Sequence, residues 1–241
     1  MTTADTMMLE LPTASETEKR GGCSSPAICS AFRCIVADPP WDYSEKGCAD
    51  GPPKPWREIR LGYKTVANMG YPVMKAAEIA ALPVRGMADD NAHLYLWTVN
   101  KFLCEAHEIA AAWGFRPMTV LTWGKVKADG TPSMKTGYYF RGATEHCLFG
   151  VRGSQPLQVK HGKPTLYLSG REPHSRKPEW FYRLCEEVSP GPYLEMFARR
   201  KRHGWASWGN EIANDVEMPN AELRHSADSA ASQTQKSNNE H

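Results

Sequence analysis

The stretch CIVADPPW, residues 34–41, decides the fold class of this chain. Its first four residues form a short apolar run, which is typical of a buried strand, and the run stops at Asp38. Two prolines follow, and because proline has a fixed φ and no N–H to donate, they predict a rigid turn. The sequence therefore predicts a carboxylate and a large indole, that of Trp41, at the end of a buried strand.

Outward from this stretch, strand-like and helix-like segments alternate. Helical spacing of apolar residues predicts helices over 73–82 and 102–113, and Pro178 opens a third helix. Gly114 is the expected C-cap of the second helix. Strands separated by helices predict an α/β domain with a mostly parallel sheet and helices on both faces. The further strands are expected at 94–97, 118–123, 146–151 and 193–197.

Composition limits the class of protein. The 241 residues include 29 Lys plus Arg and 27 Asp plus Glu, for a net charge of +2. This balance excludes a wholly basic coat protein for nucleic acid, although it permits a local basic patch. No stretch approaches the roughly 20 apolar residues of a membrane span, and no signal peptide is visible, so no membrane partner is expected. Seven cysteines without a C-x-x-C pair predict free thiols and a cytoplasmic protein.

The two ends of the chain differ from its middle. Residues 1–30 lack a sustained period and are expected to be a partly disordered N-terminal extension, followed by a folded domain over 31–213. Residues 214–241 are poor in large apolar side chains, which predicts a disordered tail. Two long Gly/Pro-rich segments, 42–71 and 152–177, interrupt the domain, and the second is expected to be a hairpin or lid.

The motif Asp38-Pro39-Pro40-Trp41 suits a planar base that bears an exocyclic amino group. The carboxylate and a proline carbonyl can accept the two N–H bonds, and the indole can stack on the ring. An amine held in this way directs its lone pair at an electrophile, which is catalysis by orientation and electrostatics without a metal. The alternative is a proline-rich turn with a structural tryptophan.

Further sequence blocks follow the motif in a fixed order between residues 32 and 212. They are YPVM 71–74, YLWTVNK 95–101, WGF 113–115, WGK 123–125, EHCL 145–148, HSRKP 174–178, EMFAR 195–199 and GN 209–210. With these blocks the chain resembles the adenine N(6)-methyltransferases that include the catalytic subunit of the eukaryotic mRNA adenosine methyltransferase, with bacterial and phage relatives. The resemblance implies a Rossmann-like, S-adenosylmethionine-dependent methyltransferase with a permuted motif order, acting on the N(6) amino group of adenine in nucleic acid.

The resemblance also implies site residues. The motif residues Asp38, Pro39, Pro40 and Trp41 would hold the adenine and present its amino group, with Tyr71 in a gate loop beside the base. Lys177, in the lid-like segment, would pair with the carboxylate of S-adenosylmethionine. The implied cofactor contacts are Asp38, Lys177, Glu195, Arg199, Asn210 and Glu211. One departure is Glu211, which stands where the mRNA enzyme carries an amide.

Three other features leave alternatives open. The basic run Arg200-Lys201-Arg202 could anchor substrate phosphates, or it could be a solvated turn. The aromatic residues 138–140 could stack on splayed bases or belong to the core. His146 and Cys147 lack partners at zinc spacing, so no metal site is expected.

The expected partner is nucleic acid, and DNA is preferred over RNA because compact relatives of this type resemble bacterial or phage DNA enzymes. A duplex target would have to flip out its base. A homo- or heterodimer is also expected. One alternative is a catalytically inactive family member that binds nucleic acid or a catalytic sibling. Another is a methyltransferase for a small molecule or a protein amide.

Overall fold

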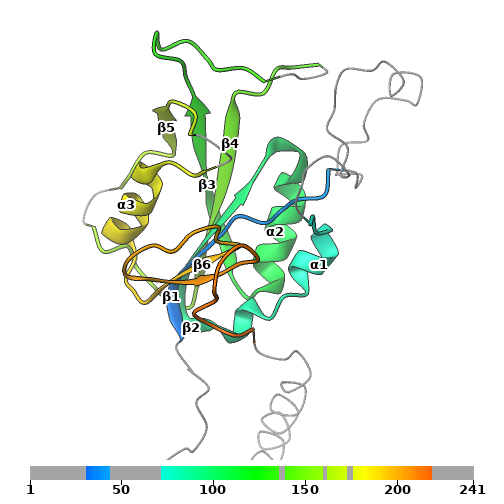
Figure 1. Ribbon diagram of the computed structural model, residues 1–241. Coiled ribbons are helices and arrows are strands. Elements are labelled where there is room, and N and C mark those ends of the chain that lie inside the picture. Colours follow the sequence, from blue (N-terminus) through cyan, green and yellow to red (C-terminus); the bar gives the residue numbers. More distant parts are fainter. Residues whose placement is uncertain (1–30, 44–71, 136–138, 160–161, 173–175, 219–241) are drawn as a thin grey trace, which may run out of the picture.

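The computed structural model describes residues 31–43, 72–135, 139–159, 162–172 and 176–218 (Figure 1). The expected N-terminal extension, Tyr71 and most of the expected tail lie outside the described residues. The strands are β1 (Phe32–Ala37), β2 (Ala88–Thr98), β3 (Arg116–Lys125), β4 (Thr144–Arg152), β5 (Leu166–Ser169), β6 (Tyr193–Met196) and β7 (Trp205–Trp208). The helices are α1 (Ala76–Ala80), α2 (Leu103–Ala112) and α3 (Glu179–Val188), with 3-10 turns η3 (Val84–Gly86) and η4 (Asn100–Phe102).

The strands form one seven-stranded sheet in the order β5-β3-β4-β2-β1-β6-β7. Strand β4 runs antiparallel to both of its neighbours, and every other adjacent pair is parallel. The expectation of a mostly parallel sheet is confirmed, with β4 as the exception. This exception follows from the connection, because β3 returns into β4 as a long hairpin without a crossover helix.

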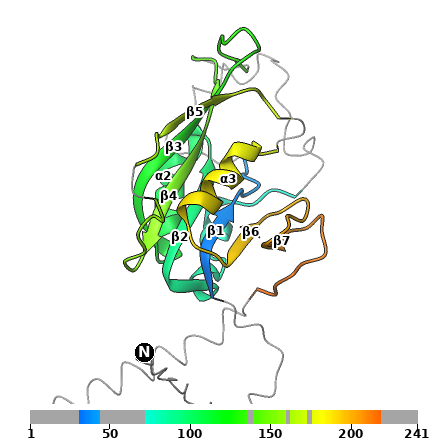
Figure 2. The ribbon, with the colours of Figure 1, turned by 90° about the vertical axis from the view of Figure 1, so that its left-hand side faces the viewer.

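Helices cover both faces of the sheet, as expected. Helices α1 and α2 pack on one face and α3 packs on the other (Figures 1 and 2). Strand β1 lies near the centre, where Ile35 and Ala37 face α1 and α2 while Cys34 and Val36 face α3. All four side chains are buried, which explains why the strand is a continuous apolar run instead of an alternating one.

The first helix is shorter than the predicted 73–82. Residue Met74 pairs with the turn after β1, because its N–H donates to the Pro40 carbonyl at 2.8 Å and its carbonyl accepts from Asp42 at 3.0 Å. Extended pairing at this position delays the helix to Ala76. The second helix ends as predicted, and Gly114 follows it with a φ of +83°.

The architecture places several chain segments at one edge of the sheet. The parallel strands β1, β2, β3 and β6 end at this edge, and the antiparallel β4 begins there. Asp38 follows β1 directly, Lys125 ends β3 and Glu145 is the second residue of β4. Polar side chains far apart in sequence therefore meet where ligands of α/β sheets bind.

Candidate active site

The turn after β1 is fixed by backbone hydrogen bonds. The Trp41 N–H donates to the Pro39 carbonyl at 3.0 Å, and Met74 donates to the Pro40 carbonyl. Both proline carbonyls thus already hold one partner, and each retains a second lone pair for a ligand. The Asp38 side chain is 39% exposed. The turn therefore presents one accessible carboxylate on a rigid backbone.

Trp41 is placed differently from the expected open stacking face. Its indole is 6% exposed and stacks on Phe102, with ring centroids 5.0 Å apart and planes 12° apart. Its Nε1 donates to the Trp97 carbonyl at 3.1 Å. The face that Phe102 covers is closed to a base, so in this structure Trp41 anchors the turn to the core.

A chain of alternating charges leads from the turn to β3. The Lys177 ammonium donates to Asp38 Oδ2 at 2.6 Å and lies 3.5 Å from Glu145 Oε2. Glu145 in turn pairs with Lys125. We call Asp38, Lys177, Glu145 and Lys125 the charge chain. The structure brings together Asp38 and Lys177, two of the expected cofactor contacts, and adds Glu145 and Lys125 to them.

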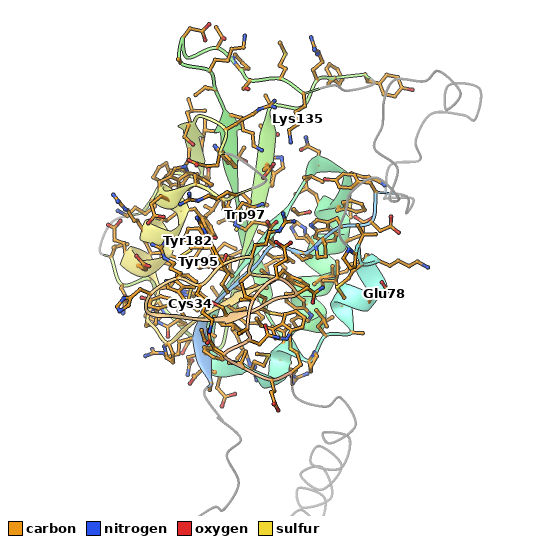
Figure 3. All side chains as sticks on the ribbon, viewed as in Figure 1. Cys34, Glu78, Tyr95, Trp97, Lys135 and Tyr182 are labelled. Carbon is orange, nitrogen blue, oxygen red and sulfur yellow. The ribbon has the colours of Figure 1, made fainter. Side chains whose placement is uncertain are left out.

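Aromatic rings form the floor of the charge chain. The Lys177 nitrogen lies 4.9 Å from the ring centroid of Trp97, and the Lys125 nitrogen lies 4.3 Å from that of Trp123. Trp97 is the next-to-last residue of β2 and packs on the face of the sheet that α3 covers; Figure 3 labels it below Lys135. These rings restrict water and stabilise the cations through cation–π contact.

The charges stabilise one another against burial. Burial alone would lower the pKa of Lys177, but the Asp38 and Glu145 charges raise that pKa above its ordinary value. Burial opposes ionisation of Glu145, yet Lys177 and Lys125 hold its pKa below the ordinary value. For Lys125, burial prevails over the Glu145 charge and lowers its pKa. Lys177 and Glu145 are therefore ionised at neutral pH, and Asp38 faces a fixed ammonium.

A second carboxyl stands beside the turn on the neighbouring strand. Glu195 of β6 is in register with Val36 of β1 and accepts a hydrogen bond from the Tyr182 hydroxyl at 2.6 Å. Burial raises the pKa of Glu195; the bond from Tyr182 opposes this shift, and the Asp38 charge adds to it. The expected cofactor residues Asp38 and Glu195 thus lie on adjacent strands at one edge.

A cleft of about 160 Å³ shares part of the charge chain. Cations outnumber carboxylates in its walls, so it favours an anionic ligand. We call it the basic cleft, and its lining residues are Trp123, Lys125, Lys135, Glu145, Arg171, Glu172 and Arg176.

The residues after β6 divide into two groups. Arg199 and Glu211 are two expected cofactor contacts, and Arg199 Nε lies 3.5 Å from Glu211 Oε1 at the surface. Asn210, which precedes Glu211, is also exposed. Arg200 is also exposed. These side chains form an exposed polar rim beside the strand end, in which Arg199 is paired with Glu211.

The rest of the basic run is engaged with the fold. Arg202 donates to Glu179 at 2.8 and 3.0 Å and to Glu186 at 3.0 Å, so it ties the run to α3. Lys201 pairs with Asp215. Of the three predicted phosphate contacts, Arg200 alone has no ion pair among those found in the described part of the chain.

Sequence reasoning assigned no role to Lys125 and Glu145. The available signal was a charged residue at the end of each of two apolar strands, within the blocks WGK and EHCL. Within the described residues, no group of three His, Cys, Asp or Glu side chains could hold a metal ion. Nor does this part of the chain contain a helix that is long and apolar enough to cross a membrane.

Comparisons with known proteins show which sequences this chain resembles. The sequence model of the MT-A70 family matches residues 32–211. The chain is 29% identical to the Type II methyltransferase M.MunI of Mycoplasma sp over 198 residues, which cover 78% of this chain and 81% of that protein. It is 27% identical to the N(6)-adenosine-methyltransferase MT-A70-like of Arabidopsis thaliana over 204 residues, covering 82% and 26% of the two chains. Human N(6)-adenosine-methyltransferase catalytic subunit METTL3 is 25% identical over 194 residues, 77% of this chain and 29% of that protein. The chain thus spans about a quarter of the length of its plant and animal relatives.

Proposed function

The chain belongs to the MT-A70 family, and from this premise we propose that it transfers a methyl group from S-adenosylmethionine to the N(6) amino group of adenine in nucleic acid. The observation that carries the proposal is the Asp38 carboxylate, held on a rigid proline turn by the buried Lys177 ammonium 2.6 Å away. Asp38 is thus a fixed and accessible hydrogen-bond acceptor at the carboxyl ends of the parallel strands. Such an acceptor can orient a primary amine for reaction.

The donor set fits S-adenosylmethionine, which when bound supplies the methyl group as a sulfonium. Lys177 offers an ammonium for the carboxylate of the methionine end. Asp38 and Glu195 offer carboxyl oxygens to its ammonium and ribose hydroxyls. Arg199 and Asn210, on the exposed rim, would contact the other end of the cofactor.

The charge chain supports the chemistry of the amine. Asp38 accepts an N–H bond from the adenine amino group, so that the nitrogen lone pair turns toward the methyl carbon. With S-adenosylmethionine bound, the Asp38 carboxylate would stabilise the positive charge that develops on nitrogen during transfer, and it would accept the proton that the methylated amine then loses. A fixed group of this kind contributes about 10²–10³ in rate, because it needs no reorganisation.

Glu145 and Lys125 act as positioning residues in this scheme. Glu145 Oε2 lies 3.5 Å from the Lys177 nitrogen as a second carboxylate partner beside Asp38, and Glu145 itself pairs with Lys125. Loss of either outer charge would let the Lys177 ammonium shift. The rate of methyl transfer should then fall, while the protein still binds the adenine that accepts the methyl group.

DNA is the substrate that we propose. The support is the relative M.MunI, which this chain matches over 81% of its length, whereas the adenosine methyltransferases of plants and animals match over about a quarter. We also propose that the protein acts in the cytoplasm and as a homo- or heterodimer.

Mass spectrometry of nucleosides tests the proposal. DNA and RNA would be incubated with the protein and methyl-labelled S-adenosylmethionine, beside Asp38→Ala. Label in 6-methyladenine that disappears in the variant supports the proposal, and the labelled pool identifies the substrate. No label in either pool, with cofactor binding intact, contradicts it and favours an inactive partner subunit.

A further inference from the structure

The connection between β3 and β4 extends beyond the sheet (Figure 1). It carries two exposed aromatic rings. We call residues 126–143 the β3–β4 arm; 126–135 and 139–143 are described. Phe140 is 92% exposed and Tyr139 is 75% exposed. The interpretation of these rings as core residues is therefore wrong, and Tyr138 lies outside the described residues. Large apolar rings that remain in water suit a function in binding.

The arm is held to the candidate active site by hydrogen bonds. At its base the Lys125 N–H donates to the Ala143 carbonyl at 2.7 Å. Further out, the Lys135 N–H donates to the Gly142 carbonyl at 2.8 Å. Phe140 therefore lies two residues from Gly142, which pairs with Lys135. Lys125, at the base of the arm, also lines the basic cleft.

A second segment braces the arm. Arg171 lies just after β5, and its guanidinium donates to the Ser133 carbonyl at 2.5 Å. Arg171 and Lys135 also line the basic cleft. The basic cleft therefore extends from the charge chain to the lower part of the arm. Figure 3 labels Lys135 in this part of the arm, above Trp97.

The charges near the rings favour one class of ligand. Arg141 directly follows Phe140 in the sequence, and Lys135 and Arg176 line the basic cleft. A protein partner that buried Phe140 would have to desolvate these cations. A nucleic acid would instead place phosphates against them and a base against the ring.

We propose that Phe140, with Tyr139, is a stacking platform for an unpaired base that flanks the target adenine. The cations of the basic cleft hold the phosphates between the two nucleotides. This inference rests on the proposed function and deepens it, because it assigns the enzyme a preference for single-stranded or locally unpaired nucleic acid. The stacked base can be of any sequence, since every base offers a π-face.

A fluorescent base analogue tests the platform. Single-stranded oligonucleotides would carry one target adenine and 2-aminopurine at successive flanking positions, and their fluorescence and affinity would be measured with the full-length protein. We expect quenching at one flanking position. Phe140→Ala should abolish it and weaken binding about 5- to 100-fold, the range for loss of one stacked base.

Two matched variants serve as controls. Phe140→Trp keeps a π-face and should retain the quenching. Leu157→Ala removes another exposed apolar side chain, 40% exposed, and should leave binding unchanged. Sedimentation of each variant reports its oligomeric state.

The outcomes separate this inference from the proposed function. Quenching that depends on Phe140, without methyl transfer by the wild type, supports the platform while the proposed function fails. Methyl transfer with equal oligonucleotide affinity for wild type and Phe140→Ala overturns the platform. It is also overturned if Phe140→Ala dissociates a dimer and leaves the quenching intact, because the ring then serves a protein partner.

Discussion

Loss of the Lys177 ammonium should destabilise the protein through Asp38. Breaking a fully buried ion pair by removing one partner costs about 3–5 kcal/mol. Here Asp38 is 39% exposed and Glu145 keeps Lys125, so solvent and the second cation reduce the cost. We expect Lys177→Met to lower the free energy of unfolding by about 1–3 kcal/mol. Urea denaturation at pH 7 measures it.

A double-mutant cycle isolates the pair. Asp38→Asn combined with Lys177→Met should show a coupling energy of about 1–3 kcal/mol. Lys201→Met is the matched control, because that lysine is 52% exposed and pairs with Asp215, so its loss should cost at most about 1 kcal/mol. Additivity of the two active-site substitutions within about 0.5 kcal/mol would refute the charge chain as a structural unit.

Three further predictions concern other parts of the molecule. The pKa of Glu145 is lowered in the folded protein, so the ionised carboxylate stabilises the fold above the unfolded pKa near 4.5, and this stabilisation is lost as pH falls. Glu145→Gln should therefore flatten the decline of the unfolding free energy below about pH 4.5. Urea denaturation between pH 3 and 7 measures this decline. Gly209→Ala would place a Cβ 2.0 Å from a backbone carbonyl oxygen and should lower Tm by about 2–12 °C, whereas Gly162→Ala, with no atom within 4 Å, should leave Tm unchanged in the same calorimetric scan. Arg202→Ala should lower Tm without altering the salt dependence of nucleic-acid binding, whereas Arg176→Ala should reduce the slope of log K against log salt by about 1; equal slopes for the two variants would contradict this division.

The fold follows from sequence where burial is continuous. The apolar run 34–37 predicts a central strand because both of its faces are covered, and β1 confirms it. The first helix was predicted too long because Met74 pairs with the turn of Asp38, a contact that periodicity does not contain. Strands β5 and β7 were missed because neither is a continuous run of buried apolar residues: Leu166 and Leu168 of β5 are exposed, and a serine, Ser207, occupies a buried position of β7.

The site was predictable in part. Asp38 and Lys177 lie 139 residues apart, and the sequence blocks brought them to one site before the structure did. The pairing of Lys125 with Glu145 depends on the register of β3 and β4, which no single strand reveals. Trp41 suits a base as well as it suits Phe102, and only the packing decides between them.

The central claim is that the Asp38 carboxylate orients an adenine amine for methyl transfer. The single-turnover rate from labelled S-adenosylmethionine to an adenine oligonucleotide, wild type against Asp38→Asn, tests it most directly, with cofactor affinity measured on the same samples. We predict a rate at least about 100-fold lower in the variant when both proteins are saturated with the cofactor. A rate within tenfold of wild type would contradict the claim.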